Sequence, residues 1–78
     1  MTELRIPQAG SEMDEGKLVE WLVPSGTRVD EGRPVYVLAT DKVEMDVKAP
    51  TSGVLHHVGE AGQVYPVGAV VARIEEQA

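Results

Sequence analysis

Residues 35–48 read VYVLATDKVEMDVK, two strand-sized runs of apolar residues that meet at the dipeptide Asp41-Lys42. From residue 43 onward apolar and charged side chains alternate, which is typical of a strand with one buried and one solvated face. If Asp41 and Lys42 form a two-residue turn, the apolar residues of both strands share one face, whereas a shift by one residue sets Leu38 opposite a charge. The predicted pairs are Thr40–Val43, Leu38–Met45 and Tyr36–Val47.

This register predicts a β-hairpin with Lys42 at its tip and Met45 at a core position. The dipeptide Asp-Lys is not the Asn-Gly or Asp-Gly that a two-residue type I′ turn prefers, so the turn type stays open. A charged tip is by itself typical of any soluble surface, because it discourages pairing between strand edges. The chain has only three lysines, however, and the other two, Lys17 and Lys48, fall inside predicted strands.

Glycine and proline recur every few residues and leave no room for an average helix between them. With many Val and only 4% aromatic residues, the composition favours short strands joined by tight turns. Residues 1–78, at 8.4 kDa, suffice for a single domain. We therefore predict an all-β barrel or sandwich of eight strands, two of them very short. The predicted strands are 4–6, 17–23, 28–29, 35–40, 43–48, 54–58, 64–65 and 70–74.

An internal repeat links the two halves of the chain. Residues 26–32 and 62–68 each begin and end with glycine, and the apolar residues that follow match at an offset of 36. The matching pairs downstream are Val35–Val71 and Leu38–Ile74, and those upstream, with one residue deleted, are Gly16–Gly53, Leu18–Leu55 and Trp21–Val58. Chance recurrence in a chain rich in Gly and Val is the alternative. A true repeat predicts two similar halves, with the turn at residue 41 at the opposite end of the molecule from the C-terminus.

Charge and cysteine content limit the classes of function that this chain can have. Thirteen acidic against seven basic residues give a net charge of -6, which repels phosphate backbones and anionic lipids, so we expect neither a nucleic-acid nor a membrane partner. No apolar run approaches the length of a membrane span, and the acidic N-terminus lacks the basic region of a signal peptide. With no Cys, neither disulfides nor a thiolate metal site can form. We expect a reduced, cytoplasmic setting.

Other candidate sites are weaker. His56 and His57 are adjacent in a predicted strand, so they point to opposite faces and cannot bind one metal ion together. We expect one of them to be half-buried. Trp21 is expected to fill the core. No grouping typical of nucleophilic catalysis and no phosphate-binding glycine loop is present in the sequence, so we predict neither a catalytic residue nor a metal site.

The residues around Lys42, ATDKVEMDVKAP at 39–50, resemble the attachment motif of lipoyl domains from the acyltransferases of 2-oxo acid dehydrogenase complexes. The resemblance extends from about residue 4 to residue 75. Three positions, expected at the surface, depart from the family pattern. The family usually has acidic residues where this chain has Thr27, Arg33 and Ala39. The other matching residues are Ile6, Pro7, Gly10, Met13, Glu15, Gly16, Trp21, Gly26, Gly32, Gly53, Leu55, Gly62, Gly68 and Ile74.

This resemblance implies a flattened barrel of two four-stranded antiparallel sheets with quasi-twofold symmetry, in which Lys42 carries lipoic acid as an amide. The lipoyl group on Lys42 would act as a swinging arm. It would carry acyl groups from a thiamine-diphosphate 2-oxo acid decarboxylase to the acyltransferase core, and electrons to dihydrolipoamide dehydrogenase. The domain itself would be a non-catalytic, monomeric carrier. A lipoate ligase or lipoyl transferase would recognise Asp41 and Val43. The acidic loop of residues 8–15 would contact the decarboxylase through Glu12, Asp14 and Glu15. The alternative is that these carboxylates are only solvated.

Two alternatives remain open at this stage. Biotinyl carriers share the fold and the hairpin lysine, but place Met on both sides of it, where this chain has Asp41 and Val43. The second alternative is an interaction module in which Lys42 is not modified. The opening loop leans toward a pyruvate or acetoin complex over a 2-oxoglutarate or branched-chain one. The sequence leaves open whether the carrier is free-standing.

Overall fold

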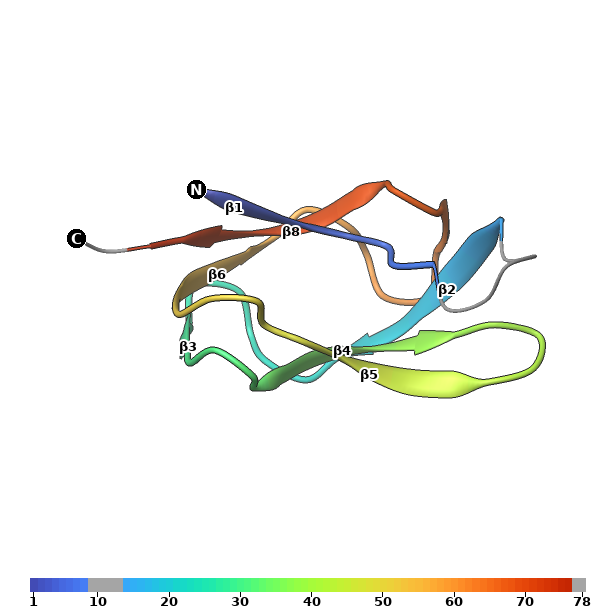
Figure 1. Cartoon of the computed structure of the whole chain (residues 1–78), viewed down its shortest axis with the longest axis horizontal. Coiled ribbons are helices and arrows are strands. Elements are labelled where there is room, and N and C mark those ends of the chain that lie inside the picture. The colour runs from blue at the N-terminus through green and yellow to red at the C-terminus, as the bar shows by residue number, and fades with distance from the viewer. Residues whose placement is uncertain (9–13, 77–78) are drawn as a thin grey trace.

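The computed structural model describes residues 1–8 and 14–76, which form eight β-strands in two antiparallel four-stranded sheets (Figure 1). The strand orders are β1-β8-β6-β3 and β5-β4-β2-β7. The strands are β1 (Thr2–Arg5), β2 (Glu15–Trp21), β3 (Arg28–Val29), β4 (Pro34–Ala39), β5 (Glu44–Lys48), β6 (Gly53–His57), β7 (Val64–Pro66) and β8 (Val70–Glu75). Both the all-β prediction and the implied architecture of two four-stranded sheets are confirmed. No helix in the described residues is long and apolar enough to cross a membrane.

Each predicted strand coincides with an observed one, and the differences lie at the strand ends. The largest is in β2, which was expected at 17–23 and is observed at Glu15–Trp21. Strand β1 was expected at 4–6 and begins instead at Thr2, where it pairs with Ile74 of β8. The register shifts between Leu4 and Arg5. Ile6 lies beyond the end of β1, and its backbone N–H donates to the Ala69 carbonyl at 3.0 Å. Pairing across the sheet, which no local pattern encodes, sets these ends.

The two halves of the chain repeat each other in backbone geometry. Gly26 and Gly62 both have φ of 87°, a conformation that side chains disfavour, so glycine is required at each turn. The Gly26 N–H donates to the carbonyl of Leu55 at 2.7 Å, and the Gly62 N–H donates to that of Leu18 at 2.6 Å. Each half thus closes its turn on the strand of the other half, and the repeat predicted from glycine spacing is present in the structure.

The upstream alignment of the repeat is corrected at Trp21, whose counterpart is not Val58. The register of β2 shifts between Leu18 and Glu20, so β2 carries one extra residue that β6 lacks. Beyond this bulge the offset returns to 36. The N–H groups of Leu22 and Val58 donate to equivalent carbonyls, at 2.8 and 2.9 Å. Val58 therefore matches Leu22. Trp21 matches His57.

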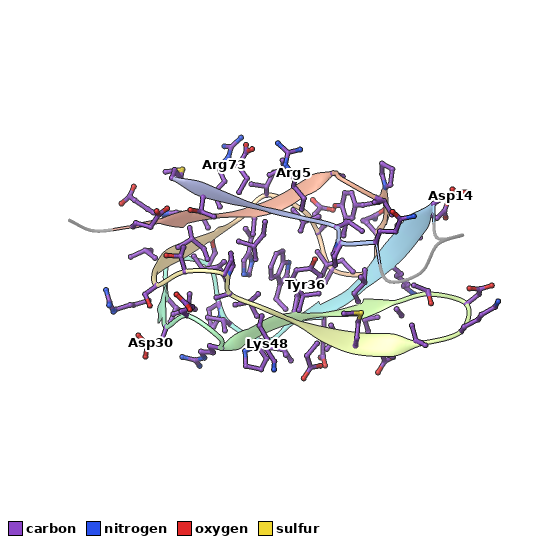
Figure 2. The ribbon with its side chains drawn as sticks, in the orientation of Figure 1. Arg5, Asp14, Asp30, Tyr36, Lys48 and Arg73 are labelled. Atoms are coloured by element: carbon purple, nitrogen blue, oxygen red, sulfur yellow. The ribbon has the colours of Figure 1, made fainter. Side chains whose placement is uncertain are left out.

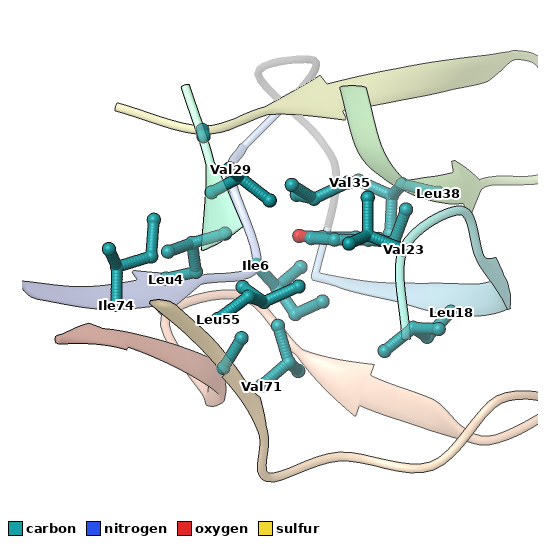
Figure 3. Close-up of a cluster of buried hydrophobic side chains, with 13 residues drawn as sticks. Leu4, Ile6, Leu18, Val23, Val29, Val35, Leu38, Leu55, Val71 and Ile74 are labelled. Carbon is teal, nitrogen blue, oxygen red and sulfur yellow. The ribbon is translucent and has the colours of Figure 1, made fainter. Parts of the chain in front are cut away.

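The core lies between the sheets and follows the same symmetry (Figure 3). Leu18 pairs with Leu38 in one sheet and Leu55 with Ile74 in the other, and all four side chains are fully buried. Burial of each such side chain contributes about 1.5–3 kcal/mol, which a small domain without disulfides requires. The predicted match of Val35 with Val71 is confirmed, because both are buried at equivalent sites.

The molecule is elongated, with a long axis of 38 Å. The loop between β4 and β5 lies at one end, and the N-terminus and the end of β8 lie at the other (Figure 1). This is the placement that the repeat predicts, because the ends of β4 and β8 are symmetry counterparts. A group attached at the loop therefore extends away from the N-terminus and the end of β8.

Candidate functional site

The hairpin formed by β4 and β5 has the predicted register. The Cα pairs include Tyr36–Val47, Leu38–Met45 and Ala39–Glu44. Beyond the strands, the Thr40 N–H donates to the Val43 carbonyl at 2.8 Å, so that Asp41 and Lys42 alone occupy the tip. Asp41, Lys42 and Val43 are exposed. The strand register and the two-residue tip that the apolar alternation predicts are therefore present in the backbone of this hairpin.

The side chains of β5 are less buried than predicted. Met45 was expected at a core position and is 37% exposed, although its partner Leu38 is fully buried. Two features explain the difference. β5 is the edge strand of its sheet, and Figure 1 shows the hairpin extending past the ends of β1 and β8, so the opposite sheet does not cover its inner face. Val43, nearer the tip, is 51% exposed for the same reason.

The turn at Asp41 and Lys42 is not of a primed type. Types I′ and II′ require positive φ, and within the described residues no position other than glycine has one. The hydroxyl of Thr40 lies inside this turn, accepting from the backbone N–H groups of Lys42 and Val43 at 3.2 and 3.1 Å. From sequence, Thr40 is predicted only as a paired strand residue, without these hydrogen bonds. The position of Thr40 directly before the turn could have predicted them, since Ser and Thr side chains often bond to the backbone of a turn that follows them.

Lys42 presents a primary amine to solvent. Among the described residues, no carboxylate oxygen lies within 4.0 Å of this amine, so no ion pair holds the side chain against the surface. The other two lysines are exposed too, but their backbones are fixed in strands. Lys17 pairs with Ala39 on one side and with Val64 on the other, and Lys48 closes β5. Of the three lysines, only Lys42 lies at a turn.

Carboxylates gather at the hairpin end of the molecule. Figure 2 shows Asp14 at this end, and Glu15 opens β2, whose Lys17 pairs with Ala39 at the base of the hairpin tip. Asp14 and Glu15 are exposed. The Val67 N–H donates to the backbone carbonyl of Asp14 at 3.0 Å, which anchors the start of β2 to the chain after β7. The third predicted recognition residue, Glu12, lies outside the described residues.

The histidines and the tryptophan take no part in this end. Trp21 packs against the core and His57 stacks on its ring, while His56 pairs with Arg73 and faces the other side of its sheet. The expectation that one histidine is half-buried is confirmed, and the other is half-buried as well. The adjacent side chains point to opposite faces, as strand geometry requires.

Tyr36 is a titratable residue whose side chain lies in the interior. Its side chain is fully buried between the sheets (Figure 2), and its ring packs edge to face with that of Trp21 at a centroid distance of 5.4 Å. Burial raises the pKa of the Tyr36 phenol to about 12, because the charged form is poorly solvated there. Its hydroxyl has no hydrogen-bond partner among the described residues. Tyr36 belongs to the core and not to the hairpin tip.

Similar proteins were found by comparison of sequence. The succinyltransferase component of the Bacillus subtilis 2-oxoglutarate dehydrogenase complex is 34% identical over 79 residues, covering 100% of this chain. The dihydrolipoyllysine-residue acetyltransferase component of the Pseudomonas putida acetoin cleaving system is 38% identical over 74 residues, covering 94% of this chain. The chain spans only 19% and 20% of the length of these two relatives.

A solved structure shares the fold. The lipoyl domain of the 2-oxoglutarate dehydrogenase complex from Azotobacter vinelandii superposes with a TM-score of 0.82, covering 100% of both chains at 23% identity. A family model, Biotin_lipoyl, with the description "Biotin-requiring enzyme", matches residues 2–74. The resemblance inferred from the residues around Lys42 is thereby confirmed, and the chain belongs to the Biotin_lipoyl family.

Proposed function

We propose that this chain is a lipoyl carrier domain in which lipoic acid is joined as an amide to the Nζ of Lys42. The observation that carries the proposal is the position of Lys42. Its amine is exposed at the tip of a rigid two-stranded hairpin, at the end of the molecule opposite the N-terminus and the end of β8. The relatives support the choice of cofactor, because the one from the acetoin cleaving system is a dihydrolipoyllysine-residue acetyltransferase component.

The residues present fit the attachment of an acyl group. The Lys42 amine has no ion pair to lose among the described residues, and amide formation removes its positive charge without burying anything. Once bound, lipoic acid would supply a dithiolane that exchanges acyl groups and electrons. The chain would hold the attachment point at a fixed site on β4 and β5 while leaving the side chain free to reach into other active sites. Asp41 and Val43 flank the amine in the open, where a lipoate ligase or lipoyl transferase would recognise them.

The partners follow from the carrier role. They would be a thiamine-diphosphate 2-oxo acid decarboxylase, an acyltransferase core and dihydrolipoamide dehydrogenase. A tethered carrier raises the effective concentration of its cofactor at each of these sites. Asp14 and Glu15, with Glu12, would offer negative charge to a basic surface on the decarboxylase. The domain would be monomeric and non-catalytic, residues 1–78 would act as one unit, and the setting would be cytoplasmic.

The opening segment favours one class of complex. Ile6 and Pro7, then Met13, and finally Glu15 and Gly16 follow the pattern of pyruvate and acetoin complexes. The opening segment thus leans toward one of these two, while the choice between them and a 2-oxoglutarate or branched-chain complex stays open. Both classes occur among the relatives, which include components of the acetoin cleaving system and of the 2-oxoglutarate dehydrogenase complex.

Biotin attachment is the second candidate, because the matching family model carries the description "Biotin-requiring enzyme". The same exposed lysine would serve either cofactor. The flanking residues argue for lipoate, since Asp41 and Val43 stand where biotinyl carriers have Met. The two functions differ only in which ligase accepts the hairpin tip.

The experiment is a direct competition between ligases. The purified protein is incubated with ATP and either a lipoate ligase with lipoic acid or a biotin ligase with biotin, and its intact mass is measured. We expect one lipoyl addition, little biotinylation, and no addition of either kind to the Lys42→Gln variant, which serves as the matched control. Absence of lipoylation, or biotinylation at an equal or higher rate, would overturn the proposal.

A further inference from the structure

The tip of the β4–β5 hairpin is closed by one backbone bond and one side chain. In an ordinary two-residue hairpin loop, the residues on either side of the loop exchange two backbone hydrogen bonds. Here the Thr40 N–H donates to the Val43 carbonyl at 2.8 Å, but the Val43 N–H donates to the Thr40 hydroxyl at 3.1 Å. The hydroxyl takes the place of the Thr40 carbonyl.

The same hydroxyl makes two further contacts. It accepts from the Lys42 N–H at 3.2 Å, and its own hydrogen points to the Val43 carbonyl at 3.4 Å, a longer and weaker bond. A hydroxyl has two acceptor lone pairs and one donor, so these three contacts use its full capacity. Each contact joins Thr40 to Lys42 or to the residue after it.

These contacts fix the backbone on both sides of the Lys42 Cα. The N–H of Lys42 belongs to the peptide before that atom, and the N–H and carbonyl of Val43 lie after it. Holding both sides restricts φ and ψ of Lys42, and these angles set the direction of its Cα–Cβ bond. Restraint from elsewhere is small, because no proline fixes φ at residues 40–43 and the tip extends beyond the opposite sheet.

We propose that Thr40 is a positioning residue for the modification of Lys42, an inference that rests on the carrier function proposed above. Its hydroxyl holds the lysine backbone in the one conformation that presents the amine to the lipoate-attaching enzyme. The enzyme must bring the amine nitrogen into line with an activated acyl carbon, and small errors of position in such a reaction cost large factors in rate. Thr40 itself touches neither the acyl group nor the amine.

Three variants separate positioning from simple exposure. Thr40→Val keeps the shape of the side chain and removes the hydroxyl, Thr40→Ser keeps the hydroxyl, and Lys42→Gln removes the amine. The initial rate of lipoylation by a lipoate ligase is measured by intact mass at varied domain concentration. We expect Thr40→Val to lose about tenfold in kcat/KM, mainly in kcat, and Thr40→Ser to stay within about twofold of the parent.

A chemical reaction provides the readout that a merely structural role would not change. Acetylation of Lys42 by a small activated ester, followed by peptide mapping, reports exposure of the amine without an enzyme. We expect the same chemical rate in the parent and in Thr40→Val, because the amine is in solvent in both. Hydrogen exchange at the Lys42 and Val43 amides should become faster in Thr40→Val, and the melting temperature should barely change.

The outcomes are distinguishable. If the ligase modifies the parent and Thr40→Val at equal rates, the positioning role of Thr40 is wrong while the carrier function stands. If Thr40→Ser is as slow as Thr40→Val, the hydroxyl is not the group responsible, and the inference is again wrong. If the ligase leaves the parent unmodified, the carrier function itself fails and takes this inference with it.

Discussion

Trp21 and His57 stack with ring centroids 3.8 Å apart and ring planes 10° apart, and they occupy equivalent positions in the two halves of the chain. Their ring nitrogens form a reciprocal pair of contacts. Trp21 Nε1 donates to the Gly59 carbonyl at 3.3 Å, and His57 Nε2 lies 2.8 Å from the Val23 carbonyl. A carbonyl only accepts, so His57 Nε2 carries the proton. Each half thus places an aromatic ring on the backbone of the other, and the stack joins the two sheets.

This arrangement predicts unequal costs for two adjacent histidines. His57→Ala removes the stack and one bond to Val23, so the free energy of unfolding should fall by about 1–3 kcal/mol. His56→Ala, on the opposite face, should change it by less than about 0.5 kcal/mol. Chemical denaturation followed by the fluorescence of Trp21, the only tryptophan, measures both. Equal losses would show that the stack contributes nothing beyond ordinary strand packing.

The two tyrosines predict opposite effects on stability. The Tyr36 hydroxyl is buried without a partner among the described residues, whereas the Tyr65 hydroxyl accepts from the Glu60 N–H at 2.7 Å. Tyr36→Phe should leave the free energy of unfolding unchanged or raise it, by up to about 1 kcal/mol. Tyr65→Phe should lower it by about 0.5–1.5 kcal/mol. A loss in Tyr36→Phe as large as that in Tyr65→Phe would mean that the buried hydroxyl is satisfied.

Tyr36 also predicts a loss of stability in alkali. Its pKa is about 12 in the folded protein and 10.0 when unperturbed, so below pH 10 its contribution is complete. Between these values the unfolded chain releases the proton while the folded one keeps it, and stability falls as pH rises, by about 1.4 kcal/mol per pH unit at most. Denaturation curves across this window should show a smaller decline for Tyr36→Phe. Parallel declines in the parent and the variant would contradict the assignment to Tyr36.

Gly53 is required by contact with the last strand. A Cβ at this position would lie 2.5 Å from the Glu75 carbonyl oxygen and 2.7 Å from Ile74 Cγ2, whereas one at Gly26 would meet nothing within 4 Å. Gly53→Ala should therefore lower the free energy of unfolding by about 2 kcal/mol or more, through forced separation of β6 and β8. Gly26→Ala should cost about 1 kcal/mol from its positive φ alone. Equal values from thermal unfolding of the two variants would contradict this account.

Moving the lysine by one position tests recognition of the tip. The double substitution Asp41→Lys with Lys42→Asp keeps composition and charge, but its amine projects from a different point of the turn. Stability should stay within about 0.5 kcal/mol of the parent, since both positions are exposed, while lipoylation should become much slower. A companion double substitution, Asp41→Met with Val43→Met, should shift preference toward a biotin ligase. Rapid lipoylation of the lysine at position 41 would show that the enzyme requires only an exposed amine and not its position in the turn.

The hairpin and the repeat could be predicted from sequence because both depend on local spacing. Apolar alternation specifies which residues of 35–48 share a face, and positive φ restricts turns to glycine at Gly26 and Gly62. Met45 could not be placed, because its exposure depends on where the opposite sheet ends. The bulge in β2 was missed as well, since an unpaired extra residue leaves no periodic signal, and Trp21 was matched to the wrong partner as a result.

The central claim, that Lys42 carries lipoic acid, is tested most directly on protein isolated from its native host. Intact mass followed by peptide mapping reports whether the chain is modified, with what group, and at which residue. We predict a single lipoyl amide on the peptide that contains Lys42, with Lys17 and Lys48 unmodified. Lipoate on Lys17 or Lys48, biotin on Lys42, or an unmodified Lys42 would contradict the claim.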